Sequence, residues 1–213
     1  DPRLRLSSGH VGSQGGLVAL RQGRAHFGGC HLFDPETNTY NVPYIKRLLP
    51  GLPLKLINLA WRQQGIMVAP GNPKNITTIP DLARPEVRFI NRQRGAGTRL
   101  LLDYLLQEHG LAASAIQGYD REEYTHMAVA VNVFSGTADA GLGILAAARA
   151  LGLDFIPLTP ERYDLVVPET TFADPRFQTV LGVIRSREFQ DAAEALGGYD
   201  LRDCGAILWE QRG

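Results

Sequence analysis

The sequence predicts an α/β fold built on parallel-dominated sheets, and three observations support this prediction. Short apolar runs alternate with segments of helical periodicity along most of the 213 residues. Strands that alternate with helices usually pair in parallel through right-handed crossovers. Polar, glycine-rich loops follow two of the strand-like runs, at the position where ligands bind in such sheets.

The elements of the N-terminal half are bounded by capping and turn residues. Ser13 suits an N-cap, and Gly23 lies just past the end of the helix that Ser13 would start. Strand-like runs here are short, apolar and flanked by glycine, proline or asparagine. In chain order we predict a strand over 4–8, a helix over 13–23, a strand over 25–33, a polar turn region over 34–41, strands over 54–60 and 65–70, and turns around a short helix over 71–86.

The C-terminal half shows the alternation more clearly. Leucines recur at three- and four-residue spacing after Arg99, which predicts a helix that Gly110 stops. The run 127–136 is rich in branched residues, but its length and its terminal Gly136 favour a helix. The predicted strands are 87–92, 138–143, 154–158 and 163–168, and the predicted helices are 98–110, 127–136, 144–152, 177–186 and 188–198.

Composition narrows the classes of function. The chain carries 22 basic and 22 acidic residues, so no global field attracts nucleic acid or an anionic membrane, and we expect neither as a partner. No apolar run reaches the roughly 18 to 20 residues of a membrane span, which predicts a soluble chain. Cys30 and Cys204 form neither a disulfide framework nor a zinc motif. A reducing, cytoplasmic location suits them.

The loop NRQRGAGTR, at residues 91–99, combines features of an anion site. Gly95 and Gly97 allow backbone amides to converge, and Thr98 can cap the helix that follows. Free amides at a helix N-terminus attract anions. Forked donors matched to oxyanions come from Arg92, Arg94 and Arg99. The alternative is an ordinary strand-to-helix turn with solvated or acid-paired arginines.

A second loop, SSGHVGSQGG at residues 7–16, has similar chemistry. It offers the hydroxyls of Ser7, Ser8 and Ser13, the imidazole of His10, and amides beside its glycines. The loop lacks the lysine of a P-loop and the spacing of a nucleophile elbow. Two such loops predict an oxyanion or small polar ligand that is held without covalent chemistry.

Motifs of the common enzyme classes are missing from the sequence. It contains no HExxH, no CxxC and no dinucleotide-binding GxGxxG, and its five histidines form no metal-ligand pair. The acidic segment DREEYTH could supply a base from Glu122 or Glu123, although such acids usually favour the first turn of a helix. We therefore expect a protein that is not an enzyme and that binds no cofactor and no metal.

Long ordered stretches of the chain resemble a known family. The sequence resembles the cytoplasmic periplasmic-binding-protein-like (PBP-like) domain that is attached to MoeA-type molybdenum-cofactor biosynthesis proteins and to helix-turn-helix regulators. More distantly it is similar to the tungstate and molybdate binders of ABC transporters. The stretches that carry the resemblance are GHVGSQGGLVALRQGRAHFGGCHLFDPETNTYNVPYI, QGIMVAPGNPKNI, VRFINRQRGAGTRLLLDYLL, REEYTHMAVA, SGTADAGLGILAAARALGLDFIPL and ERYDLVVP.

The resemblance aligns the loop 91–99 with an arginine and a Ser-Gly-Thr of the transporter binders. Arg92 takes the place of the arginine, and Gly97 and Thr98 take the last two positions. Ala96 stands where the serine would be and offers only its backbone amide. Anion binding would then depend more on Arg92, Arg94 and Thr98.

The resemblance also implies a type II PBP-like fold, with two α/β lobes and a ligand cleft between them. Lobe one would comprise 1–62 and 163–213, lobe two 63–162, with crossings near 60–66 and 159–164. Compared with the family, lobe one would lack an N-terminal strand and helix. The implied ligand-binding residues are Ser8, His10, Ser13, Arg92, Arg94, Gly97, Thr98, Tyr124, Thr125 and Tyr163, the last of which could equally be a packed hinge residue.

The function implied by the resemblance is that of a ligand sensor. The domain would bind molybdate, tungstate or a related oxyanion and report occupancy to a fused or neighbouring regulator or MoeA-type domain. One alternative is an enzyme domain in molybdopterin cofactor assembly, with Glu123 or His126 as proton carrier and Arg92 on a phosphate. Another is a degenerate binding fold that serves protein interaction.

Overall fold

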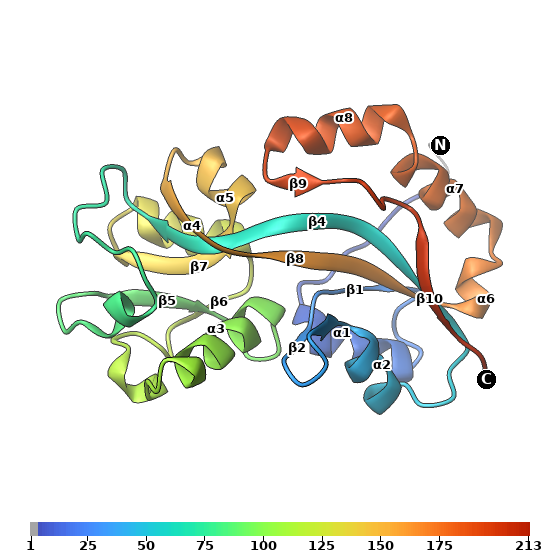
Figure 1. Ribbon diagram of the computed structural model, residues 1–213. Coiled ribbons are helices and arrows are strands. Elements are labelled where there is room, and N and C mark those ends of the chain that lie inside the picture. Colours follow the sequence, from blue (N-terminus) through green and yellow to red (C-terminus); the bar gives the residue numbers. More distant parts are fainter. Residues whose placement is uncertain (1–3) are drawn as a thin grey trace.

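Two long strands organise the fold in the computed structural model, which describes residues 4–213 (Figure 1). β4 (Leu54–Val68) and β8 (Asp154–Pro168) are 15 residues each and pair antiparallel along their whole length. Each replaces two strands that the sequence predicts separately. Apolar runs stop at polar residues in the middle of both strands, but the backbone ladder continues through them, and Gln64 and Glu161 are buried there.

The other strands extend this central ladder into one curved sheet. Its order is β1-β8-β4-β7-β5-β6, with β9 and β10 paired to β4. The mixed α/β class is confirmed. Because the chain leaves along β4 and returns along β8, these strands are antiparallel, and the expected dominance of parallel pairs holds only where β5 joins β6 and β7. The shorter strands are β1 (Gly28–Cys30), β5 (Phe89–Arg92), β6 (Glu122–Glu123), β7 (Ala140–Ile144), β9 (Tyr199–Asp200) and β10 (Ile207–Gln211).

The elements between β4 and β8, residues 69–153, form what we call the α3 half (Figure 1). α3 covers one face of β5 and β7, and α4 and α5 cover the other, so the half has two apolar clusters. Phe89, Leu102 and Leu142 belong to the first cluster, and Ile90 and Val129 belong to the second. Its helices are α3 (Gly97–Glu108), α4 (His126–Phe134) and α5 (Leu145–Ala150), with single 3₁₀ turns at Pro80–Ala83 and Ala113–Ala115.

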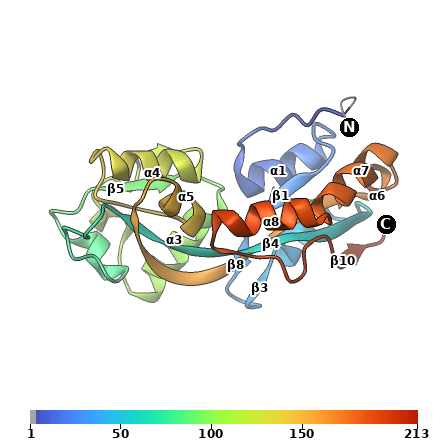
Figure 2. The same ribbon diagram turned by 90° about the horizontal axis from the view of Figure 1, so that it is seen from above.

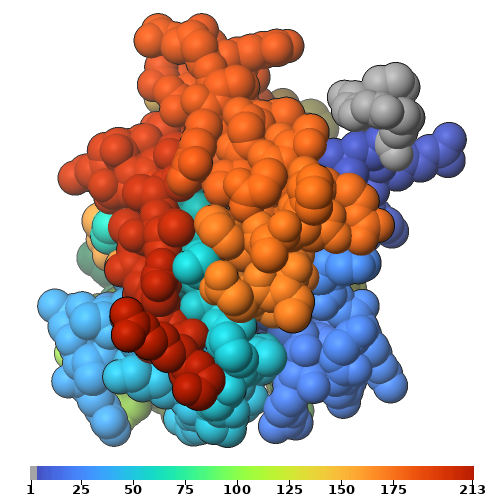
Figure 3. Space-filling view, turned by 90° about the vertical axis from the view of Figure 1, so that its right-hand side faces the viewer, coloured from blue at the N-terminus to red at the C-terminus, as the bar shows by residue number. Residues whose placement is uncertain are grey.

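Residues 4–53 and 169–213 form what we call the α1 half (Figures 1 and 2). α1 and α2 pack on one face of the sheet and α7 packs on the other, which again gives two apolar clusters. Figure 3 views this half end-on, with the C-terminal helices in orange and red above the blue segments of α1 and α2. Its elements are α1 (Gly12–Arg21), the hairpin β2 (Phe33–Asp34) and β3 (Thr39–Tyr40), α2 (Val42–Leu48), α6 (Glu169–Phe172), α7 (Pro175–Ile184) and α8 (Arg187–Leu196).

Some predicted elements are wrong. Residues 4–8 form no strand, because their segment packs against no sheet and Leu6 is 68% exposed. Helix α1 starts at Gly12 with Val11 at the N-cap, so Ser13 lies in the first turn instead of capping it. The strand predicted over 25–33 shrinks to β1 and part of β2, and α2 was not predicted.

Four predicted helices are confirmed. The predicted helices at 98–110, 127–136, 177–186 and 188–198 correspond to α3, α4, α7 and α8 within three residues at each end. Cys30 is buried, Cys204 is half-buried, and both are free thiols. Among the helices of residues 4–213, none has the length and apolar character to cross a membrane.

Candidate functional site

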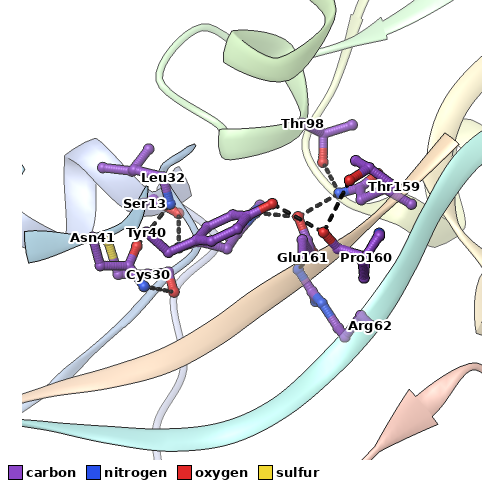
Figure 4. A network of polar contacts seen from close by, with 12 residues as sticks. Ser13, Cys30, Leu32, Tyr40, Asn41, Arg62, Thr98, Thr159, Pro160 and Glu161 are labelled. Atoms are coloured by element: carbon purple, nitrogen blue, oxygen red, sulfur yellow. Dashed lines mark hydrogen bonds and ion pairs between the residues drawn. The ribbon is translucent and has the colours of Figure 1, made fainter. Parts of the chain in front are cut away.

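A buried polar cluster lies midway along β4 and β8, between the two halves. Arg62 on β4 pairs in register with Glu161 on β8, and its Nη2 donates to the Glu161 carboxylate. Gln64 Nε2 donates to Glu161 at 2.7 Å and to Thr98 Oγ1 at 2.8 Å. His31 Nδ1 lies 3.0 Å from Glu161 Oε2. Figure 4 shows Glu161 between Arg62 and Thr98, so the carboxylate links the crossing strands to both halves.

The two halves meet at this cluster through backbone contacts. The Gln14 amide of α1 donates to the Gly95 carbonyl of the α3 half at 3.2 Å. Within the α1 half, the His31 amide donates to Ser13 Oγ at 3.2 Å. Gly97, the first residue of α3, packs directly on the His31 backbone and ring. A Cβ at position 97 would overlap His31, so this close approach requires glycine.

Tyr163 forms an aromatic wall of the cluster. Its ring stacks on His31, with centroids 5.5 Å apart and planes 27° apart. The Arg62 guanidinium lies 4.3 Å from the centre of the Tyr163 ring, which favours the cation. A Cβ at Gly29 would overlap the Tyr163 hydroxyl, so Gly29 makes room for this arrangement.

Arg92, at the end of β5, brings a second buried cation to the cluster. Its Nε donates to the Glu123 carbonyl at 3.2 Å, and its Nη2 donates to the Tyr124 carbonyl at 3.1 Å. Its Nη1 is buried without a hydrogen-bond partner within residues 4–213. Five other side-chain nitrogens of the described chain share this state, among them Arg62 Nε, Gln93 Nε2 and His126 Nδ1, and the acceptor Gln64 Oε1 shares it too. Buried donors are rarely left unpaired in proteins, so this set indicates a place for an acceptor.

Burial and mutual repulsion set the charges of the cluster. Burial, reinforced by Arg62, lowers the pKa of Arg92 to about 10, so Arg92 stays charged at neutral pH. Burial also lowers the pKa of His31 and of His126, and both arginines add to the effect. Burial alone would raise the pKa of Glu161, but Arg62 and then His31 hold it well below its usual range. At neutral pH the cluster therefore combines two cations, one carboxylate and two neutral imidazoles.

The structure brings half of the predicted site residues to the cluster. Ser13 and Thr98 are buried within it, Arg92 supplies a cation, Gly97 permits the contact between the halves, and Tyr163 stacks on His31.

The other predicted residues lie outside the cluster or contribute only backbone. Tyr124, a residue that is 62% exposed, offers its carbonyl, and Thr125 caps α4 by accepting from the Ala128 amide at 3.0 Å. The Arg94 side chain is 81% exposed, near Asp120. Ser8 and His10 are exposed in the irregular segment before α1.

Sequence reasoning missed four central residues, His31, Arg62, Gln64 and Glu161. The available signal was the polar segments WRQQ and PER, which interrupt strand-like runs on both crossings. Glu123, considered as a proton carrier, accepts from Asn132 Nδ2 at 2.9 Å. Residues 4–213 contain no group of three or more metal-ligating side chains.

Comparison with known proteins decides the family. The profile of the PBP superfamily domain matches residues 1–185. The chain belongs to the PBP superfamily. This superfamily is one of binding proteins, which agrees with the expected absence of catalysis. The type II PBP-like fold predicted from the sequence is thereby confirmed.

Two relatives are similar to this PBP-superfamily chain in sequence. The uncharacterized protein YvgK of Bacillus subtilis (strain 168) is 39% identical over 201 residues, which are 94% of this chain and 65% of YvgK. An uncharacterized Clostridium pasteurianum protein from the 5′ region of a 2Fe-2S ferredoxin gene is 38% identical over 112 residues, 52% of this chain and 99% of its own length. The chain thus spans slightly less than two thirds of YvgK.

Solved structures share the fold at low identity. An ABC-type phosphate transport receptor from Vibrio cholerae has a TM-score of 0.55 at 16% identity, over 93% of this chain and 88% of its own. The AvGluR1 ligand-binding domain in complex with phenylalanine has a TM-score of 0.57 at 13% identity, over 98% of this chain and 78% of its own. Their ligands differ, so the fold alone does not select one.

Proposed function

We propose that this PBP-superfamily chain is a non-catalytic domain that binds a small anion in the polar cluster. The observation that carries the proposal is a pair of arginines, the buried Arg92 and Arg62 with its side chain only 10% exposed, against a single buried carboxylate, Glu161. A buried charge needs a partner, and one positive charge of the cluster is left without one. An anion would accept from the unpaired donors of both arginines and of His126.

The ligand that we propose is an oxyanion of the molybdate or tungstate type. Guanidinium groups present forked donors that match the oxygens of such anions. The resemblance of the loop at Arg92 to molybdate and tungstate binders favours these two, and the shared fold with a phosphate receptor makes phosphate the main competitor. In this proposal the domain acts in the cytoplasm, in molybdenum-cofactor metabolism or its regulation.

Binding would stabilise the contact between the halves. We equate the α1 half with lobe one, residues 1–62 and 163–213, and the α3 half with lobe two, residues 63–162. Arg62 lies on a crossing strand, Arg92 belongs to the α3 half, and His31 belongs to the α1 half. A ligand that binds both arginines would favour the closed arrangement, in which His31 joins the same cluster through Glu161, over an open one. A fused or neighbouring regulator or MoeA-type domain would then respond to the change.

The test compares two arginines that are two positions apart. Isothermal titration with molybdate, tungstate, phosphate and sulfate at equal ionic strength is expected to show one preferred anion. Arg92→Gln is expected to weaken that binding by at least about tenfold, since a buried charged donor is lost. Arg94→Gln, which removes an exposed arginine, is the matched control and should bind normally. If both variants lose the same amount of anion affinity while circular dichroism shows intact folding, the proposed site is wrong.

One observation favours a second candidate, a degenerate binding fold. Glu161 already accepts hydrogen bonds from Arg62, Gln64 and His31, as a bound anion would. If this internal carboxylate has replaced the ligand, the wild-type protein binds none of the four anions and Glu161→Gln gains binding. If the wild-type protein binds an anion, the degenerate candidate fails.

A further inference from the structure

A second pocket lies beside β8, outside the polar cluster. It encloses about 490 Å³, and its wall includes Arg162. Arg162 sits between Glu161 and Tyr163, which both belong to the cluster. Neighbouring side chains on a strand point to opposite faces, so the pocket opens on the other side of β8. No residue that lines it contributes to the cluster.

Two aromatic side chains give the pocket rigid walls. Trp209 on β10 packs against the apolar cluster that contains Leu54 and Leu56. The Tyr40 hydroxyl donates to the Pro160 carbonyl at 3.1 Å, which fixes its ring against β8 (Figure 4). The remaining apolar lining comes from Val42, Pro43 and Leu208. Aromatic walls that are held in this way offer flat surfaces for a ring.

Two cations lie in the same pocket. Lys46, in the last turn of α2, has its Nζ 6.0 Å from the centre of the Trp209 ring and forms no ion pair within the described chain. Arg162 donates to the buried Asp164 carboxylate at 2.8 Å and to the Tyr40 carbonyl at 3.1 Å, which holds it in place. No acidic residue lines the pocket.

Neighbouring acidic side chains are already engaged. Asp34 accepts from the Thr37 amide at 3.0 Å and from the Thr37 hydroxyl. Asp164 is fully buried and also accepts from Asn41 and Asn58. The positive charge that faces the cavity therefore comes mainly from Lys46, while Arg162, which also lines the cavity, is paired with Asp164. This sign of charge favours an anionic ligand.

We propose that this pocket is a second binding site, for a small aromatic anion. Its ring would lie against Trp209 and Tyr40, and its carboxylate or phosphate would reach Lys46 and Arg162. The volume falls within the roughly 300 to 1,000 Å³ that ligand pockets span. This site is separate from the polar cluster and does not depend on what the cluster binds.

Three naphthalene probes and inorganic phosphate test the chemistry. The chain has two tryptophans, so a ¹⁵N-labelled sample gives two indole signals, and Trp209→Phe assigns them. With 2-naphthoate or 2-naphthyl phosphate the Trp209 signal is expected to shift in a saturable way. The probe that binds more tightly shows whether the site prefers a carboxylate or a phosphate. Neutral 2-naphthamide and inorganic phosphate should each bind at least about tenfold more weakly, because each lacks one of the two required features.

Two lysine variants locate the site. Lys46→Gln is expected to weaken the binding of the anionic probe at least about fivefold, and Lys46 is exposed, so its loss leaves the core intact. Lys74→Gln, in the α3 half, is the matched control and should bind normally. The proposal is overturned if the Trp209 signal does not move, if 2-naphthamide binds as well as 2-naphthoate, or if Lys46→Gln binds like the wild type. Arg92→Gln should bind the probe normally, which separates this result from the fate of the anion cluster.

Discussion

Arg62 and Glu161 face each other in register across β4 and β8, and both side chains are buried where the strands pass between the halves. Each strand contributes one member of the ion pair to the same point of the ladder. Gln64 and His31 complete the hydrogen bonding of the carboxylate. The pair therefore belongs both to the polar cluster and to the structural link between the halves.

Removing one member of this pair is expected to destabilise the protein strongly. Arg62→Met or Glu161→Gln should each lower the free energy of unfolding by about 3 to 5 kcal/mol, since the remaining charge or its partners stay buried without compensation. The double variant should lose clearly less than the sum of the two. Urea denaturation of the four proteins measures this, and a strictly additive double variant would show that the two side chains do not interact.

Gly97 is expected to be intolerant of a side chain. Gly97→Ala would place a Cβ against His31 and force the two halves apart, which should cost roughly 1 to 3 kcal/mol as an overpacking change. Gly182→Ala is a matched control in helix α7, where a Cβ meets no atom within 4 Å. That change should stabilise the protein by about 0.5 to 1 kcal/mol. Thermal melts of both variants distinguish the effects, and equal melting temperatures would refute the close contact.

The Asn41 side chain is expected to be essential to the loop before α2. Asn41 has a positive φ of 69°, its Oδ1 accepts from the Leu32 amide at 2.7 Å, and its Nδ2 donates to Asp164 at 2.8 Å. Asn41→Ala should lower the free energy of unfolding by about 2 to 4 kcal/mol, because both groups stay buried without a partner. Asn38→Ala, at an exposed residue that also has positive φ, should cost about 1 kcal/mol, and chemical denaturation compares the two.

Acidification is expected to destabilise the fold below the ordinary histidine pKa of 6.5. Burial, Arg62 and Arg92 lower the pKa of His126, while Glu161 opposes them and His31 adds to the lowering. Above pH 6.5, His126 is neutral in both the folded and the unfolded chain, so it does not reduce the free energy of unfolding there. As the pH falls below 6.5, the histidine becomes protonated in the unfolded chain but stays neutral in the folded chain. The free energy of unfolding therefore drops by up to about 1.4 kcal/mol per pH unit for each such histidine.

Melting temperatures between about pH 7.5 and about pH 5 test this dependence. His126→Gln should flatten the profile, because it removes the group that the folded state keeps neutral. His109→Gln, which changes an exposed histidine, should keep the wild-type profile. If the melting temperature of His126→Gln falls with pH as steeply as that of the wild type, another group causes the pH dependence.

Local signals in the sequence identified most of the long helices and the loop at 91–99. The leucine spacing of α3, the glycines at 95 and 97 and the position of Arg92 all lie within one short segment, so a single stretch was enough to predict them. The strand at 4–8 failed because its two leucines satisfy a short apolar pattern without any sheet to pack on. Helix α2 was missed because it is only seven residues long and has a proline in its first turn.

The central residues of the site could not be predicted, because they are defined by contacts between residues that are far apart in the sequence. A run such as Trp61–Gln64 is polar, and a polar run ends a predicted strand unless its partners are known. Those partners are Thr98 and Glu161, which come from two other segments. Only the three-dimensional arrangement shows that Arg62 and Gln64 are buried and paired instead of solvated.

The long β4–β8 ladder has a consequence for synthesis on the ribosome. Residues of β4 pair with residues of β8 that are roughly 100 positions later in the chain. At about 5 to 20 residues per second, β4 therefore waits on the order of ten seconds for its partner. During that interval its apolar first half, LKLINLA, has no β8 to cover it. Newly made chains should therefore recruit chaperones at this segment, and slow translation of residues 69–153 should increase aggregation.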